Sequence, residues 1–292
     1  MVQNSVAIRL NKKPHDNVFQ LEDDLDPPKP FLKWVGGKRS LLPQLDLLLP
    51  DDIGAYLEPF IGGGAMFFHL IKGGLINKAL LADINEDLVK TWVSVRDNPH
   101  RLLDLLRRHK KNHCEEYYYH VRDHFKPRSD SSIAARLIYL NKTCFNGLYR
   151  LNSRNKFNVP MGKYSSPRIV DVENIQSCQT ALRKTEIQCA SFSDLDLKDT
   201  DFAYLDPPYD DTFTNYKAGG FHQSDQCELR DHALAWAKNG VRVMMSNSDT
   251  QNIRNLYSDP IWNVTEAKAP RMINSNPNGR GAVTELVIRS YD

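Results

Sequence analysis

Four short apolar runs, each closed by polar residues or a turn, constrain the fold of this chain more than any other feature. They are AYLEPF (55–60), KALLADIN (78–85), FAYLDPPY (202–209) and GVRVMMSNSD (240–249). Apolar runs of this length, separated by helical patterns such as AMFFHLIKGG, are typical of parallel strands buried on both faces. We therefore expect an α/β protein with a Rossmann-like, doubly wound and mostly parallel sheet, completed by a last strand in TELVIRSY. Ligands bind outside the carboxyl ends of such strands, so the polar residues there are the first candidates for a site.

A basic segment interrupts this alternation. Residues 86–142 show helical periodicity, and the stretch that follows, CFNGLYRLNSRNKFNVPMGKYSSP, has the Asn, Gly and Ser content of a hairpin or long loop. Between residues 101 and 170 the chain has fifteen Lys and Arg against five Asp and Glu, although its net charge is only +2. This asymmetry favours a polyanionic partner; an ordinary solvated helical surface is the alternative.

These patterns predict how the 292 residues are divided. Residues 1–29 mix charge and proline and are expected to form a flexible leader. Residues 30–95 and 171–292 are expected to form the sheet domain, and residues 96–170 an inserted helical domain that carries the exposed hairpin.

Several classes of protein are disfavoured by composition. No run approaches the roughly 18 apolar residues of a membrane span, and no signal peptide is readable, so neither a membrane nor an anchor is expected. The five cysteines contain no CxxC pair, which favours a reducing cytoplasm over a disulfide framework or a zinc knuckle. Four histidines recur at helical spacing, and we interpret them as a solvated or DNA-facing helix surface rather than as metal ligands: His109, His113, His120 and His124.

A glycine-rich turn follows the first of these runs. In EPFIGGGAMFF, the residues Gly62, Gly63 and Gly64 allow the backbone to approach a ligand closely and expose the amides of the next helix. The spacing is not GxGxxG, so a dinucleotide is not indicated. Asp83 stands 21 residues after Gly62 at the end of the next run, where an acidic residue often holds a ribose diol. A structural turn alone explains the glycines equally well, but the turn and Asp83 together favour a nucleoside-bearing cofactor.

The segment FLKWVGGKRS (31–40) does not fit the phosphate-binding loop that its Gly-Lys pair suggests. That loop requires Gly where Leu32 stands and Ser or Thr where Arg39 stands. An aromatic residue, two lysines and a Gly-Gly pair remain, a combination suited to covering a cofactor or to contacting phosphate.

The run FAYLDPPY ends in a group of acceptors beside an aromatic ring. The prolines end the strand after Asp206 and stiffen the turn, so that the Asp206 carboxylate and the Pro207 carbonyl are held near the ring of Tyr209. Two acceptors match the two N–H bonds of an exocyclic amine, and the ring offers a face on which a base can stack. Accepting these hydrogen bonds helps the amine lone pair to attack and stabilises the positive charge that develops on nitrogen. A strand that merely ends in a Pro-Pro turn is the alternative.

The motifs DPPY, FxGxG and FLKWxGGK together resemble those of the Dam-type DNA adenine-N6 methyltransferases of the alpha group, from Phe31 to Tyr291. The resemblance implies a class I methyltransferase fold, S-adenosylmethionine as methyl donor and no metal. It implies that residues 96–170 form the target-recognition domain. It also implies transfer to N6 of a flipped-out adenine in double-stranded DNA, with GATC as the expected site.

Residue roles carried over from the resemblance fall into three groups. The implied catalytic residues are Asp206, Pro207 and Tyr209. The implied cofactor contacts are Trp34, Lys38, Glu58, Phe60, Gly62, Gly64, Asp83 and Asp206. The implied DNA contacts are Lys33, Phe145, Asn146, Leu148, Arg150, Pro160 and Tyr164. Family members often have tyrosine where Phe145 stands, so a hydroxyl contact is lost here while stacking is kept.

Three other functions are alternatives to DNA adenine methylation. Cytosine-N4 methyltransferases usually have serine before Pro-Pro, and methyltransferases of RNA or protein amides usually have asparagine; Asp206 disfavours both. An inactive DNA-binding module on the same scaffold would be expected to have lost Asp206 or the glycine turn. Both are present, which disfavours this alternative. A monomer or weak dimer is expected. A cognate restriction endonuclease in the same system, without a stable complex, and a solitary enzyme both remain open.

Overall fold

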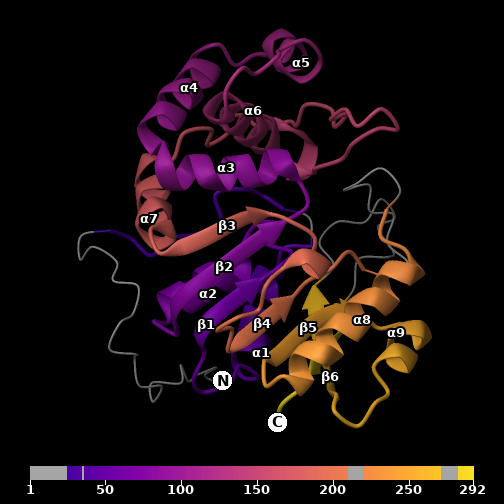
Figure 1. Cartoon of the computed structure of the whole chain (residues 1–292). Helices are drawn as coiled ribbons and strands as arrows, with labels where there is room; N and C mark the ends of the chain where they lie inside the picture. The colour runs from indigo at the N-terminus through magenta and orange to yellow at the C-terminus, as the bar shows by residue number, and fades with distance from the viewer. Residues whose placement is uncertain (1–24, 35, 210–219, 271–281) are drawn as a thin grey trace, which may run out of the picture.

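A single sheet forms the centre of the protein (Figure 1). The structure is a computed structural model and describes residues 25–34, 36–209, 220–270 and 282–292. In this part of the chain seven strands pair in the order β3-β2-β1-β4-β5-β7-β6. The first five strands of this order are parallel, and β7 is antiparallel to both β5 and β6. The predicted doubly wound, mostly parallel sheet is therefore confirmed. The strands are β1 (Gly54–Glu58), β2 (Ile76–Asp83), β3 (Thr185–Cys189), β4 (Phe202–Leu205), β5 (Arg242–Ser248), β6 (Asn263–Pro270) and β7 (Ala282–Arg289).

Helices flank the sheet, and several of them gather at one end of the molecule. Figure 1 shows α4, α5 and α6 beyond α3, at the top of the view, with α8 and α9 on the opposite side of the molecule. The four helical patterns between residues 86 and 142 are confirmed as α3 to α6. The helices are η1 (Lys38–Ser40), α1 (Leu42–Asp46), α2 (Ala65–Lys72), α3 (Glu86–Asp97), α4 (Pro99–Lys111), α5 (Glu115–Asp123), α6 (Asp130–Thr143), η2 (Phe145–Gly147), α7 (Val172–Leu182), η3 (Phe192–Asp194), α8 (Gln223–Lys238) and α9 (Gln251–Leu256).

Strand β4 is buried along its whole length because both faces of the sheet are covered there. Along β4, Phe202 and Tyr204 belong to one buried cluster, whereas Ala203 and Leu205 belong to a second cluster that α8 completes. Successive side chains of a strand point to opposite faces, so a strand buried on both faces has no polar positions. The buried side chains of α4 to α6 belong to the same cluster as Phe202, so the basic helices share a core with one face of the sheet.

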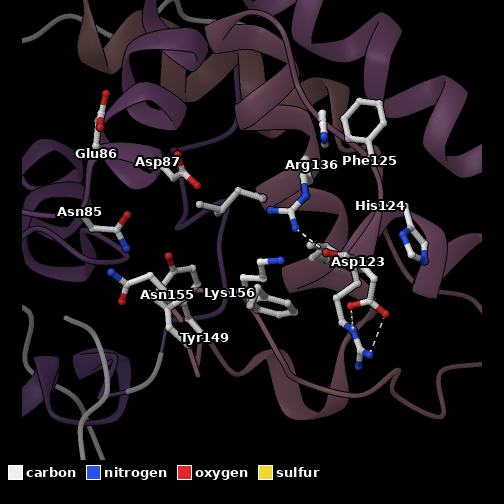
Figure 2. A pocket seen from close by; sticks show the side chains of 16 residues that line it. Asn85, Glu86, Asp87, Asp123, His124, Phe125, Arg136, Tyr149, Asn155 and Lys156 are labelled. Atoms are coloured by element: carbon white, nitrogen blue, oxygen red, sulfur yellow. Dashed lines mark hydrogen bonds and ion pairs between the residues drawn. The ribbon is translucent and has the colours of Figure 1, made fainter. Parts of the chain in front are cut away.

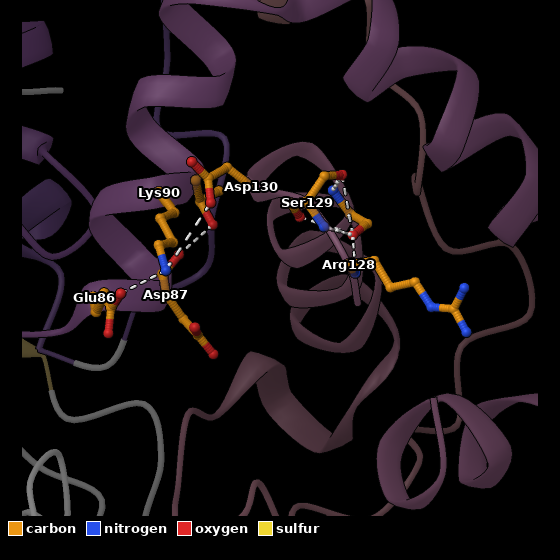
Figure 3. Close-up of polar contacts among 8 residues, drawn as sticks. Glu86, Asp87, Lys90, Arg128, Ser129 and Asp130 are labelled. Atoms are coloured by element: carbon orange, nitrogen blue, oxygen red, sulfur yellow. Dashed lines mark hydrogen bonds and ion pairs between the residues drawn. The ribbon is translucent and has the colours of Figure 1, made fainter. Parts of the chain in front are cut away.

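Helix α6 is fixed at its N-terminus. Ser129 and Ser132 form a reciprocal cap: the Ser129 side chain accepts from the Ser132 amide (3.3 Å), and the Ser132 side chain accepts from the Ser129 amide (2.9 Å). Figure 3 shows Lys90 of α3 between two carboxylates, with Nζ 2.5 Å from Glu86 Oε1 and 4.0 Å from Asp130 Oδ1. Such caps contribute about 1 kcal/mol to helix stability. The pair of Lys90 and Asp130 links the start of α6 to α3.

The histidine prediction is wrong for one of the four residues. His109 is 5% exposed, its ring stacks on Tyr139 with centroids 4.8 Å apart, and its Nδ1 lies 2.9 Å from the Tyr117 hydroxyl. Burial lowers the pKa of His109 to about 4, so this side chain is a neutral part of the core rather than part of a solvated surface. His113 is half-buried, with its Nδ1 2.9 Å from the Tyr139 hydroxyl, so the prediction holds for it only in part. His120 and His124 are exposed, as expected. The described residues contain no group of three or more His, Cys, Asp or Glu that could hold a metal ion.

The predicted leader is described only near its end, because residues 1–24 lie outside the described residues. The backbone of Lys29 is already bound to α7, since its amide donates to Asn174 Oδ1 (2.9 Å) and its carbonyl accepts from Asn174 Nδ2 (3.0 Å). Within the described ranges no helix has both the length and the apolar character needed to span a membrane.

Candidate functional site

A cavity of about 720 Å³ opens where the order of the strands reverses. Strands β1 and β4 are parallel neighbours, and the chain proceeds outward from them in opposite directions, so their carboxyl ends border the crevice in which such sheets bind ligands. Eleven of the residues predicted as catalytic, cofactor or DNA contacts line this cavity: Lys33, Trp34, Lys38, Glu58, Phe60, Gly62, Gly64, Asp83, Asp206, Pro207 and Tyr209.

A buried lysine organises the end of β4. Lys38 is 4% exposed, and its Nζ lies 2.8 Å from Asp206 Oδ1 and 3.8 Å from Glu285 Oε2. The same ammonium donates to the Gly36 carbonyl (2.9 Å) and lies 4.5 Å from the centroid of the Tyr209 ring. The Tyr209 hydroxyl in turn donates to Glu285. One cation therefore holds the carboxylate and the ring of the DPPY motif in a fixed arrangement.

Two carboxyl groups at this edge have strongly raised pKa values. Burial raises the pKa of Asp206 to about 6; Lys38 lowers it, and the charge of Glu285 raises it further. Burial raises the pKa of Glu58 to about 8, against the hydrogen bond of 2.8 Å that its carboxylate accepts from the Tyr56 hydroxyl. At pH 7, Asp206 is therefore mainly ionised and Glu58 is mainly protonated.

The glycine turn and Asp83 contact each other directly. The Gly62 amide donates to Asp83 Oδ2 (3.3 Å), and the Asn85 amide donates to Asp83 Oδ1 (3.0 Å). Burial raises the pKa of Asp83 to about 6, and these backbone hydrogen bonds oppose the rise. A Cβ at Gly62 would lie 2.7 Å from Cδ1 of Trp34, so only glycine lets the indole pack on the turn. The segment that carries Trp34 thus covers the glycine turn.

Three aromatic rings line the cavity near the glycine turn. The centroid of the Phe60 ring lies 5.7 Å from that of Phe192 and 6.1 Å from that of Phe221. All three residues line the cavity. Flat apolar surfaces of this kind suit the stacking of a planar ring, with Asp83 available as a hydrogen-bond acceptor nearby.

The remaining predicted contacts lie on a hairpin that follows α6. Backbone bridges join Cys144 to Met161 and Leu151 to Phe157, so the predicted hairpin is confirmed. The Phe145 amide donates to the Pro160 carbonyl (2.9 Å), and the Phe145 side chain is 50% exposed. This exposed aromatic side chain is available for a partner.

Two cationic side chains of the predicted DNA contacts are held in place by neighbours. Arg150 is exposed and donates from Nε to Asn158 Oδ1 (2.7 Å) across the hairpin. The Nζ of Lys33 lies 4.2 Å from the centroid of the Tyr164 ring. The structure therefore brings the seven predicted DNA contacts into one region, since Gly147, between Asn146 and Leu148, also packs on Lys33.

A second cavity, of about 460 Å³, lies between the start of α3, the end of α5, α6 and the hairpin (Figure 2). Positive and negative side chains both line it. Arg136 donates to the carbonyls of Val121 (3.1 Å) and Arg122 (2.8 Å) at the end of α5, and Arg122 pairs with Asp123 at 2.8 Å. These contacts satisfy the C-terminal carbonyls of α5, and we interpret the cavity as a structural junction.

Sequence reasoning missed several residues that shape the site. Glu285 reaches Lys38 and Tyr209 from β7, and Gln226 of α8 donates to the Pro208 carbonyl (3.0 Å). Asn141 of α6 is 2% exposed and binds two separate loops. A buried strand that contains a single carboxylate, as TELVIRSY does, was the available signal for Glu285. No local pattern marks the other two, because their partners are distant in the chain.

Comparison with known proteins gives consistent results. The family model described as D12 class N6 adenine-specific DNA methyltransferase matches residues 34–273. The Type II methyltransferase M1.LlaDCHI of Lactococcus lactis subsp. cremoris is 38% identical over 278 residues, which cover 90% of this chain and 95% of that protein. The Type II methyltransferase M.MjaIII of Methanocaldococcus jannaschii is 36% identical, with 90% and 99% covered. A DNA adenine methylase of Vibrio cholerae is 35% identical, with 88% and 94% covered.

Proposed function

Because the chain belongs to the D12 class of N6 adenine-specific DNA methyltransferases, we propose that it methylates N6 of the adenine in GATC, using S-adenosylmethionine and a base rotated out of the duplex. The observation that carries the proposal is the arrangement at the end of β4. A carboxylate held by a buried ammonium lies beside the Pro207 backbone and the Tyr209 ring at the border of a cavity.

The residues around the cavity fit S-adenosylmethionine. The volume of the cavity, about 720 Å³, lies in the range of small-molecule sites. Asp83 offers oxygens to a ribose diol, and Phe60 and Phe192 offer faces to a purine. The Trp34 side chain packs against Gly62 and Gly63 of the glycine turn and lines the cavity there. When bound, S-adenosylmethionine supplies an electrophilic methyl group on a positively charged sulfur.

Asp206 acts on the amine that is methylated. As a carboxylate it accepts a hydrogen bond from N6, with the Pro207 carbonyl as a second acceptor, and stabilises the positive charge that develops on nitrogen as it attacks. The proton that N6 releases has an acceptor within reach in Asp206, whose pKa of about 6 keeps it ionised at pH 7. Tyr209 stacks on the adenine, with its ring held by Lys38 and its hydroxyl held by Glu285.

The hairpin reads the DNA. Arg150 offers two parallel donors to the O6 and N7 edge of a guanine, and Leu148 and Pro160 offer apolar surface to a thymine methyl. Phe145 is exposed at the start of the hairpin and fills the gap left when the adenine leaves the stack. The excess of basic residues between 101 and 170 contributes affinity for phosphates. GATC as the target depends on the resemblance of FNGLYR to the recognition segment of Dam-type enzymes.

One incubation tests the proposal. The protein is mixed with labelled S-adenosylmethionine and with either a GATC duplex or a matched duplex of the same composition that lacks GATC, and the product nucleosides are separated. We expect label in N6-methyladenine from the GATC duplex alone. Label in methyladenine from both duplexes would contradict GATC as the target site. Label in methylcytosine would contradict adenine as the methylated base. No label in either would favour an inactive DNA-binding module.

A variant pair tests the role of the carboxylate. Asp206→Ala should abolish transfer while binding of S-adenosylmethionine and of DNA stays partly intact. The matched control is Asp196→Ala, an exposed aspartate in the loop before β4 that should leave turnover unchanged. Near-normal turnover of Asp206→Ala would show that this carboxylate does not act on the amine.

A further inference from the structure

Asn141, in the last turn of α6, has a side chain amide that is bound on every side. Oδ1 accepts from the Lys33 amide (2.8 Å), while Nδ2 donates to the Lys33 carbonyl (2.7 Å) and to the Gly147 carbonyl (3.0 Å). The residue is 2% exposed. One buried amide is therefore hydrogen-bonded to the backbones of two segments, one at Lys33 and one at Gly147, that lie more than a hundred residues apart in the sequence.

These two segments border different parts of the site. Lys33 and Trp34 belong to the segment that covers the glycine turn, whereas Gly147 lies inside the hairpin loop that starts with Phe145. The segments also pack closely at a second place: the Trp34 ring stacks on Tyr149 with centroids 5.0 Å apart.

Gly147 adds a steric reason why the segments fit only one way. Its φ is +65°, and a Cβ there would lie 2.5 Å from Cβ of Lys33, so the hairpin backbone lies directly against the Lys33 side chain. At its other end, helix α6, which carries Asn141, starts with the Ser129 cap and is linked to α3 by the pair of Lys90 and Asp130 (4.0 Å, Figure 3). The amide is thus a fixed point between two loops that would otherwise meet only through side chains.

We propose that Asn141 is a positioning residue that couples occupation of the cavity to DNA recognition, by making the Lys33–Trp34 segment and the hairpin move as one body. Trp34 contacts the glycine turn on one side and Tyr149 on the other, so a shift of the turn caused by a ligand reaches the neighbours of Arg150 through this junction. The inference rests on the proposed function, which assigns the cavity to S-adenosylmethionine and the hairpin to DNA. A buried asparagine that only satisfies loop backbones would stabilise the fold without coupling the two ligands.

The test measures this coupling as a ratio of affinities. The dissociation constant of a GATC duplex is determined with and without saturating S-adenosylhomocysteine, the demethylated product, whose own binding is followed by calorimetry. Coupling between two sites typically changes affinity by about 5- to 150-fold. We expect a value in this range for the unaltered protein and a value near one for Asn141→Asp, which keeps the acceptor for the Lys33 amide but removes both donors.

Thr143→Val is the matched control. Thr143 is buried on the same helix, but its hydroxyl donates only to the Tyr139 carbonyl of the preceding turn (2.6 Å), so this variant should lose stability and keep the coupling. Should Asn141→Asp not fold, Gly147→Ala perturbs the same junction from the hairpin and should also abolish the coupling.

The outcomes distinguish a failure of the proposed role of Asn141 from a failure of the proposed methyltransferase function. Binding of both ligands without coupling in the unaltered protein, or full coupling in Asn141→Asp, would overturn the role of Asn141 and leave the proposed function standing. Failure of the unaltered protein to bind either ligand would overturn the proposed function itself.

Discussion

Replacing Lys38 by methionine should move the pH dependence of methyl transfer to higher pH. Lys38 is the principal group that opposes the effect of burial on the pKa of Asp206, which lies at about 6. An adjacent opposite charge typically lowers a carboxyl pKa by about 1–3. In Lys38→Met we therefore expect the pKa of Asp206 to rise by about 2. At pH 7 the ionised fraction then falls from about nine tenths to about one tenth, so the rate falls roughly tenfold and recovers near pH 9.

The assay is kcat/KM for a GATC duplex between pH 5 and 9.5, because this ratio reports the pKa values of the free enzyme. The matched variant is Glu285→Gln. The charge of Glu285 raises the pKa of Asp206, so its removal should move the rising limb of the profile to lower pH while the amide still accepts from Tyr209. The two variants thus shift the same limb in opposite directions.

The position of the limb, rather than the height of the profile, decides the outcome. Loss of cofactor affinity or of packing in Lys38→Met would lower the rate at every pH without moving the limb. Asp83 also has a pKa of about 6, but its causes are burial and backbone hydrogen bonds, so a limb due to Asp83 would stay in place in both variants. An unmoved limb would therefore refute Asp206 as the group that must be ionised.

Three further variants test separate parts of the molecule. Arg150→Ala should reduce discrimination at one guanine of the site by about 1–3 kcal/mol, measured as kcat/KM for near-cognate duplexes, and an unchanged ranking would remove this residue from the reading set. Gly64→Ala should lower the free energy of unfolding in urea by about 2–4 kcal/mol, because φ is +65° and the new Cβ would lie 2.4 Å from Trp92. Its control is Gly240→Ala, where φ is +90° but the space is open, so the loss should be only about 1 kcal/mol. Equal losses in the two variants would contradict the proposed clash with Trp92. Phe145→Ala should weaken the fluorescence rise of a 2-aminopurine placed at the target adenine severalfold, since unstacking costs roughly a few kcal/mol without a wedge, and an undiminished signal would exclude that role.

The sheet and the helices were predictable because their signals are local. A run such as FAYLDPPY contains its own apolar residues, its own strand end and its own stiff turn, so β4 and the placement of Asp206 follow from eight consecutive residues. The glycine turn and Asp83 follow from the same logic, since their spacing is fixed by one helix between two parallel strands. His109 was misjudged because helical spacing identifies a shared face but not what covers it, and here Tyr139 of α6 does.

The partners of the site residues could not be predicted, because they come from elements that only the tertiary fold brings together. Glu285 reaches Lys38 from the antiparallel strand β7, 247 positions further along the sequence, and Asn141 meets Lys33 across 108 positions. Neither residue type has a spacing rule relative to DPPY or to FLKWVGGK. The groups that face the ligand are therefore easier to predict from sequence than the groups that bind and position those side chains.

The charges around Asp206 explain why a lysine is buried at the centre of this site. Without a cation, burial and Glu285 would keep Asp206 protonated near neutral pH, and a protonated carboxyl would be a poorer acceptor for the amine. With a fully exposed cation, solvent would screen the positive charge, and the pKa of Asp206 would also stay high. Lys38 is buried, is also bound to Glu285 and the Gly36 carbonyl, and lies over the Tyr209 ring. Its charge is divided among several acceptors, so Asp206 is ionised at pH 7 yet remains a strong acceptor for the amine.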